Sequence, residues 1–343
     1  MTMQPPCHSD VRQDSKPKRR VTIMKHLPHK TLILAPDPDG IANAARLLCA
    51  GQLVAMPTET VYGLAGDARN ADAVAAIFAA KGRPSFNPLI VHVASVAEAQ
   101  RIAELPPAAL SLASAFWPGP LTLVAPLRTG HGLAPAVTAG LQTVAIRVPA
   151  HPLAQRLLAE FGAPLAAPSA NPSGRISPTT VAHVLGGLEG RIAAILDGGS
   201  CAVGLESTIV GFEDGMPVIL REGGISREAI ANCLGTCAAP STRDKITAPG
   251  QLASHYAPRA TLRLNANAPK PGEIWIGFGP QCAEARLTLS PTGNLDEAAS
   301  RLFAVLHEAD ATGQPIAVAP VPDHGLGAAI NDRLRRAAAP RSG

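Results

Sequence analysis

The chain has 343 residues, 46% of them hydrophobic and 16% charged, with a formal net charge of +4. This length and apolar content predict two domains with cores of their own and exclude a low-complexity chain. Residues 1–30 contain seven Lys/Arg and two Asp residues, which leaves 23 basic and 24 acidic residues in the remainder. We therefore predict a disordered basic extension over 1–30 and a nearly neutral folded body.

Cysteine spacing and hydropathy bound the class of protein further. The six cysteines form no C-x-x-C pair, which argues against a zinc site and a disulfide framework, so that no protein-held metal is predicted. No apolar run reaches the ~18–20 residues of a membrane span, and the N-terminus lacks the apolar region of a secretory signal. The expected location is cytoplasmic.

Helical and strand patterns intermix from residue 31 onward. Helices are expected over 41–51, 70–82, 151–162 and 177–188, and strands over 52–57, 88–93, 121–127, 143–149, 163–169, 191–199, 207–212 and 217–224. In the helix over 70–82, apolar residues recur on one face, Asn70 can cap the start and Gly82 can end it. These elements predict one α/β domain over 31–228.

The last third of the chain has a different pattern. Residues 229–258 are polar, contain prolines and are expected to form a linker. Beyond it, strands over 261–265, 273–279 and 315–322 alternate with helices over 295–310 and 325–339. This alternation predicts a small parallel sheet, and hence a second, Rossmann-like α/β domain over 259–338.

Two polar segments border the early strands. "PTETVYGL" places Thr58 and Thr60 on one side of an extended stretch, although threonines that satisfy a turn would explain them equally well. "KGRPSFNPLIVHV" places Lys81 and Arg83 at a helix end. Phosphate recognition uses such a point charge and planar fork, whereas cations that merely favour the helix C-terminus are the alternative. His92, inside the following strand, is more often a core residue than a ligand.

Two later segments add hydroxyls, amides and one more cation. "APSANPSGRISPT" supplies Ser169, Asn171 and Ser177, and "GLESTIVGF" and "VILREGG" supply Ser207 and Arg221; loop chemistry or a surface arginine would explain each alone. The chain has no Walker A loop, G-x-G-x-x-G, nucleophile elbow or H-E-x-x-H. Cations and hydroxyls without a nucleophile favour binding and orientation of a phosphorylated substrate.

Seven motifs together resemble the YrdC-like domain, in its order and spacing: "PTETVYGL", "KGRPSFNPLIVHV", "WPGPLTLV", "TVAIRVPAHP", "APSANPSG", "GLESTIV" and "ILREGG". "PGQLASHYAP" and "GLGAAINDRLRRAA" resemble the long, two-domain form of L-threonylcarbamoyladenylate synthase, so that the resemblance covers about 31–338. It implies a twisted mixed sheet with helices and a nucleotidyltransferase that makes threonylcarbamoyl-AMP and pyrophosphate from L-threonine, bicarbonate and ATP. Mg²⁺ would bridge the ATP phosphates with few protein ligands.

The resemblance also implies roles for individual residues. Lys81 and Arg83 would be catalytic. The threonine end would be lined by Thr58, Thr60, His92, Arg147, Ala167 and Ser207. ATP would be bound by Arg83, Asn87, Thr143, Ser169, Asn171, Ser177, Arg221, His255 and Tyr256. Residues 245–258 are expected to lie across the mouth of the site as a lid.

The product would be the donor for N6-threonylcarbamoyladenosine in tRNA, made by separate threonylcarbamoyl-transfer proteins, so that tRNA is an indirect partner. Two other functions share the YrdC-like domain. A double-stranded-RNA-binding module would have a basic surface, which the neutral body does not favour. A carbamoyl-transfer factor of hydrogenase maturation would bring an acylphosphatase-like domain and cysteine zinc motifs, and this sequence contains neither.

Overall fold

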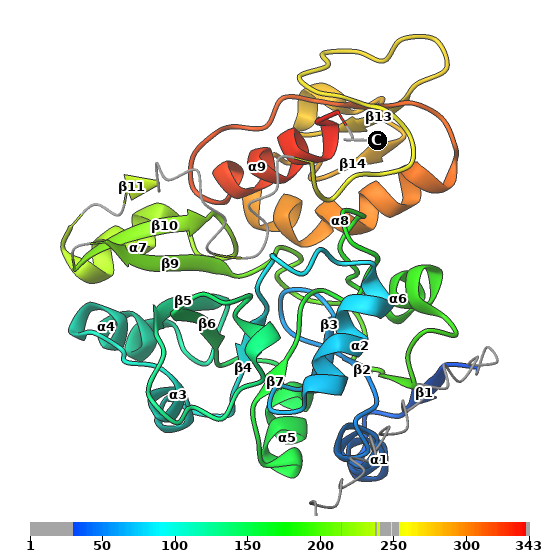
Figure 1. The fold of residues 1–343 in the computed structure, drawn as a ribbon. Coiled ribbons are helices and arrows are strands. Elements are labelled where there is room, and N and C mark those ends of the chain that lie inside the picture. The colour runs from blue at the N-terminus through cyan, green and yellow to red at the C-terminus, as the bar shows by residue number, and fades with distance from the viewer. Residues whose placement is uncertain (1–29, 214, 237–238, 241–247, 249–253, 341–343) are drawn as a thin grey trace, which may run out of the picture.

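The structure is a computed structural model that describes residues 30–213, 215–236, 239–240, 248 and 254–340 (Figure 1). The predicted basic extension lies outside these residues except for Lys30, as does much of the predicted linker. Within the described part of the chain, no helix is both long enough and apolar enough to cross a membrane.

Two sheets organise the described residues, and the larger contains eleven strands in a mixed parallel and antiparallel order. From edge to edge these are β1 (Leu32–Leu34), β8 (Ala194–Leu196), β2 (Val54–Met56), β3 (Gly63–Asp67), β7 (Leu165–Ala166), β4 (Ile90–His92), β6 (Thr143–Arg147), β5 (Leu121–Pro126), β9 (Thr208–Glu213), β10 (Met216–Arg221) and β11 (Ala239–Pro240). This confirms the mixed α/β sheet that the resemblance implies.

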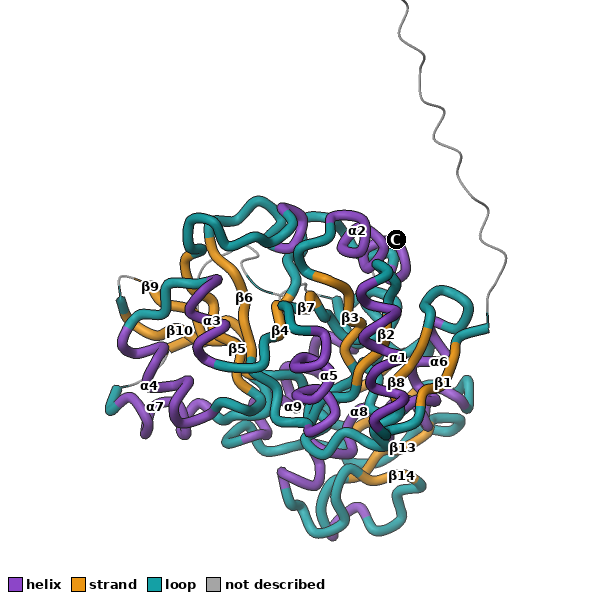
Figure 2. Tube along the Cα trace, turned by 90° about the horizontal axis from the view of Figure 1, so that it is seen from below, coloured by secondary structure: helices purple, strands orange, loops and turns teal. Residues whose placement is uncertain are grey.

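Helices cover both faces of this sheet. They are α1 (Pro38–Cys49), α2 (Ala71–Lys81), α3 (Val96–Ile102), α4 (Pro107–Phe116), α5 (Pro152–Phe161), α6 (Val181–Leu188) and α7 (Arg227–Leu234), with a short 3-10 turn at Pro135–Val137. α1 packs on α5 (Figure 2) over Val54 and Met56, whereas Ala55 between them points into the core on the opposite face. Because side chains alternate along a strand, β2 is buried on both sides.

The helix expected over 70–82 shows how directly local signals set an element. α2 begins after Asn70, whose side chain accepts hydrogen bonds from the backbone amides of Asp72 and Ala73, and ends at Gly82, whose φ of 59° lies in the left-handed region. Glycine adopts that conformation without the steric cost that a Cβ imposes. Both predicted ends of the helix are confirmed.

Several elements were not expected from the sequence, among them α3, α4 and β3. α3 has only seven residues, α4 has apolar residues all round, and β3 reads Gly-Leu-Ala-Gly-Asp, without alternation. Four of the five β3 residues are buried, since the sheet is covered on both faces there, and such a strand lacks a period-2 pattern. α7 also occupies the beginning of the segment that the sequence presented as a linker.

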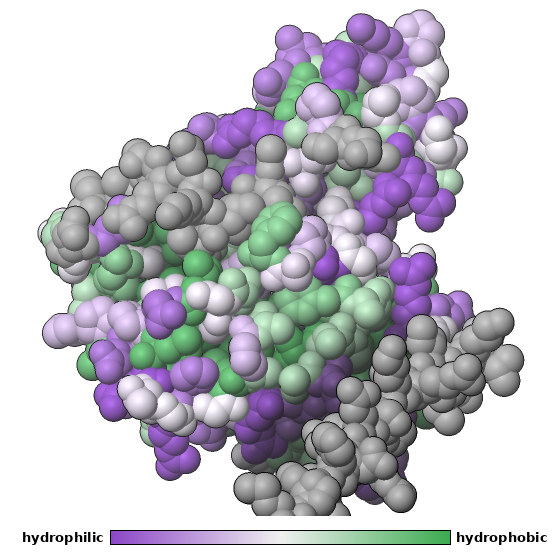
Figure 3. Space-filling view, in the orientation of Figure 1, coloured by the Kyte–Doolittle hydropathy of each residue, from purple (hydrophilic) through white to green (hydrophobic). Residues whose placement is uncertain are grey.

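The smaller sheet is entirely parallel, as predicted, with order β12 (Leu262–Arg263), β15 (Ile316–Val318), β13 (Ile274–Gly277) and β14 (Leu287–Thr288). α8 (Leu295–Ala311) and α9 (Leu326–Ala338) lie between this sheet and the larger domain (Figure 1). On the face in Figure 3 the smaller domain is mostly hydrophilic, because its apolar residues are in its core. Val61, Ile176 and Leu205 of the larger domain belong to that same core, which joins the two domains.

Candidate active site

A polar cavity of about 50 Å³ lies where the ends of β4, β6 and β10 meet the loops after β2 and β7 and before β9. Its walls are Thr58, Thr60, Val61, Gly63, Arg83, Ile90, His92, Arg147, Ala167, Pro168, Ser169, Glu206, Ser207, Arg221, His255 and Tyr256. Residues far apart in the sequence thus converge, and eleven of the predicted site residues are among them.

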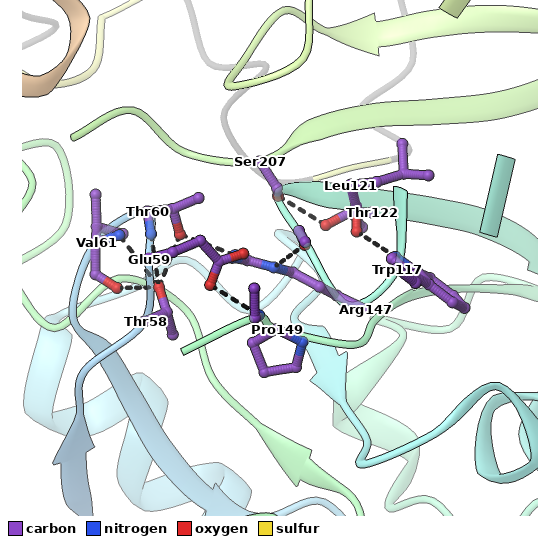
Figure 4. Close-up of polar contacts among 12 residues, drawn as sticks. Thr58, Glu59, Thr60, Val61, Trp117, Leu121, Thr122, Arg147, Pro149 and Ser207 are labelled. Carbon is purple, nitrogen blue, oxygen red and sulfur yellow. Dashed lines mark hydrogen bonds and ion pairs between the residues drawn. The ribbon is translucent and has the colours of Figure 1, made fainter. Parts of the chain in front are cut away.

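Arg147 organises one end of the cavity (Figure 4). Its guanidinium donates to Thr60 Oγ1 at 2.9 Å, to Glu59 Oε1 at 2.6 Å and to the Gly119 carbonyl at 3.2 Å. The Thr58 and Thr60 hydroxyls are 2.8 Å apart. Arg147 is at the end of β6, directly beside His92 on the parallel strand β4. The result is a buried set of mutually hydrogen-bonded hydroxyls beside one compensated charge.

Ser207 and Arg221 form a neighbouring wall. Arg221 Nη2 donates to the Ser207 carbonyl at 2.7 Å and to its Oγ at 3.1 Å, and that Oγ lies 2.7 Å from Thr122 Oγ1 (Figure 4). Gly223 allows this approach, since a Cβ there would lie 2.4 Å from the Ser207 carbonyl carbon. A glycine at position 223 therefore lets the backbone of this segment pack closely against Ser207.

The two cations of the K-x-R motif have different positions. Arg83 lines the cavity and donates to the Asn87 carbonyl at 3.1 Å and the Pro88 carbonyl at 2.8 Å. Lys81 is not among the lining residues: its Nζ donates to the carbonyls of Ser169 and Asn171 behind the wall. Burial and the charge of Arg83 hold the pKa of the Lys81 amine well below its usual value. Lys81 is thus a buried support of the S-x-N segment.

Both histidines of the cavity are neutral. Burial and the charge of Arg147 lower the pKa of His92 to about 3, and its Nδ1 lies 3.3 Å from the Ile90 carbonyl. Burial and the charges of Arg83 and Lys81 hold the pKa of His255 well below its usual value. His92 is therefore both buried in the core and part of the cavity wall. A role in the core and a role in binding a ligand do not exclude each other.

Four further predicted residues are not brought to the cavity wall. Thr143, at the other end of β6 from Arg147, lines a different cavity. Ser177 donates to Glu206 Oε1, and Asn171 Nδ2 donates to the carbonyls of Pro172 and Arg175. Asn87 is fully buried, and its side-chain amide has no hydrogen-bond partner among the described residues. A buried amide without a partner is costly, so that Asn87 is suited to a ligand.

Only the end of the segment 245–258, which was expected to form a lid, is seen to line the cavity in the described residues. Residues 245–247 and 249–253 lie outside the described residues, whereas His255 and Tyr256 line the cavity. Tyr256 has a φ of 60°, is almost fully buried and packs on Phe303 of α8 at 5.7 Å between ring centroids. The smaller domain therefore holds this aromatic wall in place.

Sequence reasoning missed two carboxylates and one arginine at the site. Glu59 pairs with Arg147, and Glu206 pairs with Arg333 of α9 at 2.7 Å. Glu59 and Glu206 lie in motifs of which only the neighbouring Thr and Ser side chains were predicted to line the site. Arg333 lies 127 residues from Glu206 in the sequence, and no local pattern indicates that the two pair. The described residues contain no cluster of three or more His, Cys, Asp or Glu side chains able to hold a metal ion.

The chain is similar to known proteins along most of its length. A family model described as telomere recombination matches residues 46–223, and one described as the C-terminal domain of threonylcarbamoyl-AMP synthase matches residues 225–339. Threonylcarbamoyl-AMP synthase of Bacillus subtilis is 42% identical over an alignment of 328 positions that covers 89% of this chain and 94% of that protein. The crystal structure of Pyrococcus abyssi Sua5 complexed with L-threonine has a TM-score of 0.82 and 38% identity, and covers 90% of this chain and 98% of its own.

A shorter relative is informative by its length. Threonylcarbamoyl-AMP synthase of Halorhodospira halophila is 44% identical over 163 residues, which are 47% of this chain and 84% of that protein. It has no room for a second domain of the size found here. The same name is therefore carried by proteins with and without a counterpart of the smaller domain.

Proposed function

This chain belongs to the threonylcarbamoyl-AMP synthase family in its two-domain form, and on that premise we propose that it converts L-threonine, bicarbonate and ATP into threonylcarbamoyl-AMP and pyrophosphate. It is an enzyme of the nucleotidyltransferase type. One observation carries the proposal. A single cavity has the Thr60 hydroxyl, bonded to Arg147, at one end and the cations Arg83 and Arg221 at the other. The first end suits an amino acid and the second a polyphosphate.

The proposed reaction has two steps. The amine of threonine takes up the carbon of bicarbonate to give a carbamate, with loss of water. A carbamate oxygen then attacks the α-phosphorus of ATP, and the bond from that phosphorus to the pyrophosphate oxygen breaks. Positioning and charge neutralisation drive such a transfer, which is consistent with a cavity lined by arginines and hydroxyls.

Magnesium enters this proposal as part of the substrate MgATP. The two carboxylates at the site, Glu59 and Glu206, already pair with Arg147 and Arg333. Mg²⁺ binds through few protein carboxylates when phosphate oxygens and water complete its octahedron. The residues of the cavity thus favour an ion that arrives on the phosphates. The product would then serve separate threonylcarbamoyl-transfer proteins that act on tRNA.

The test is reconstitution with the purified full chain. ATP, Mg²⁺, L-threonine and bicarbonate are mixed, and pyrophosphate is measured together with the mass of the nucleotide product. We expect threonylcarbamoyl-AMP and pyrophosphate in equal amounts, both depending on bicarbonate. AMP without the threonylcarbamoyl group, or double-stranded RNA binding without turnover, would contradict the proposal.

Substrate choice gives a second prediction. Thr60 Oγ1 accepts from Arg147, and Ser207 Oγ accepts from Arg221, so that a substrate hydroxyl meets fixed polar partners. A site built to bond a hydroxyl rejects an analogue without it by ~10⁴–10⁵-fold, whereas a missing methyl costs only ~10–200-fold. We expect L-serine to have a lower kcat/KM than L-threonine, and L-2-aminobutyrate a lower one still. Equal values for all three would show that Thr60 and Ser207 do not read the hydroxyl.

A further inference from the structure

Arg333 is a fully buried cation of the smaller domain whose contacts reach the larger domain. Its Nε donates to Glu206 Oε2 at 2.7 Å, and its Nη2 donates to the Glu222 carbonyl at 2.8 Å. Nη1 donates to the adjacent Asp332 at 2.7 Å, which fixes the guanidinium on α9. One side chain therefore connects α9 to two separate segments of the larger domain.

Both segments are walls of the cavity. Glu206 lines it and precedes Ser207, and Glu222 follows Arg221, so that Arg333 holds the residues on either side of the Ser207–Arg221 contact. Its guanidinium carbon also lies 5.0 Å from the ring centroid of Tyr256, a third wall. No atom of Arg333 needs to touch a substrate for these contacts to set the shape and charge of the site.

The charge of Glu206 is the critical quantity. Its carboxylate is 6% exposed and faces the same cavity as Arg83 and Arg221. Left uncompensated, a buried negative charge there would cancel a neighbouring arginine and repel a polyphosphate. The ion pair with Arg333 compensates the negative charge of Glu206, and this arginine comes from the smaller domain.

We propose that Arg333 is a positioning residue of the nucleotide site, which neutralises Glu206 so that Arg83 and Arg221 can act on the phosphates. The inference rests on the proposed function, because it assumes a polyphosphate in this cavity. It assigns the smaller domain a role in nucleotide affinity rather than in the chemical step. That role is compatible with a shorter relative of the same name that has no room for the domain.

The proposal predicts a dependence on pH. Glu206 is faced by Arg333 from α9, Arg221 from β10, and Tyr256 and Ser177 from their loops. Burial alone would raise the pKa of Glu206, but the charges of Arg333 and Arg221 and the bond from Ser177 outweigh it and lower that pKa. Without Arg333 the pKa rises, so that Glu206 is ionised and repels ATP at high pH but becomes neutral as the pH falls.

The experiment measures the Kd of MgATP by calorimetry and the KM for ATP, at pH 8.5 and pH 6, in the full chain. For Arg333→Met we expect a Kd raised roughly 30- to 300-fold over the unaltered chain at pH 8.5, and a ratio several-fold smaller at pH 6. The effect on kcat should be much smaller than that on KM. Arg301→Met is the matched control, because it breaks an exposed ion pair with Glu297 on α8, and its Kd should not change.

Two further variants keep the test independent of folding. Arg333→Lys retains the charge and should restore most of the affinity at pH 8.5. Glu206→Gln/Arg333→Met removes both charges and should bind ATP at least tenfold more tightly than Arg333→Met. An unchanged Kd in Arg333→Met, equal losses in the lysine and methionine variants, or a double variant no better than Arg333→Met would overturn the proposal.

The readouts separate this inference from the proposed function. Binding of MgATP is measured without turnover. An unaltered chain that binds MgATP but forms no threonylcarbamoyl-AMP would refute the proposed reaction, and the binding data would still decide the role of Arg333. Normal turnover with a pH-independent Kd in Arg333→Met would refute the inference alone.

Discussion

Arg83→Met is expected to lower kcat/KM for adenylate formation by about two to three orders of magnitude, or ~2.7–4 kcal/mol of transition-state stabilisation. Arg83 lines the cavity and has no ion pair with a carboxylate among the described residues. Burial lowers its pKa to about 10, still far above working pH, so that its charge is available to the phosphates. Pyrophosphate release under initial-rate conditions provides the measurement.

Two controls define this result. Arg83→Lys keeps the charge but loses the planar fork, and we expect an intermediate loss of about tenfold. Arg69→Met removes an exposed arginine that pairs with Asp67 at 3.0 Å, and its activity should stay within twofold. Activity of Arg83→Met within threefold of the unaltered chain would show that this cation does not act on the substrate.

Lys81→Met is expected to lower both stability and activity. The two carbonyls that Lys81 Nζ binds would lose their donor in a buried place, which costs about 1–3 kcal/mol each. The Ser169–Asn171 segment would then lose its support, and with it a wall of the cavity. The position of Lys81 is consistent with the expected helix over 70–82, since Lys81 is the last residue of α2 and is only 3% exposed.

The measurement is urea unfolding together with kcat/KM well below the melting temperature. We expect the free energy of unfolding to fall by about 2–6 kcal/mol in Lys81→Met. Lys270→Met, at an exposed lysine, should change it by less than about 0.5 kcal/mol. An unaltered unfolding free energy with lost activity would instead place Lys81 at the substrate.

Much of the fold could be predicted, because most elements carry their own signals. Asn70 and Gly82 set the ends of α2, and α8 and α9 alternate with short apolar strands that could only form a parallel sheet. β3 and α4 carried no such signal. Their burial depends on what the rest of the chain packs against them, and a local pattern does not record that.

The residues of the site also fall into those that a local motif indicates and those that no local motif indicates. Arg147, Ser207 and Arg221 follow from motifs at strand ends, where side chains meet at one edge of a sheet. Glu206 and Arg333 acquire their roles only through a contact between domains. Thr143 was expected to bind ATP, but it lies at the other end of β6 from Arg147 and lines a different cavity. Two residues on one face of a strand need not lie at the same end of it.

The size of the cavity has an energetic consequence. About 50 Å³ is far below the roughly 300–1,000 Å³ of typical small-molecule sites, so that we expect the cavity to expand when an amino acid and a nucleotide bind. If the expanded form is about 1% populated, the apparent Kd of the first substrate is weakened about 100-fold. The second substrate meets an enclosure already expanded and does not incur that cost again. Threonine and ATP should therefore each strengthen the binding of the other, over and above the effect of direct contacts between them.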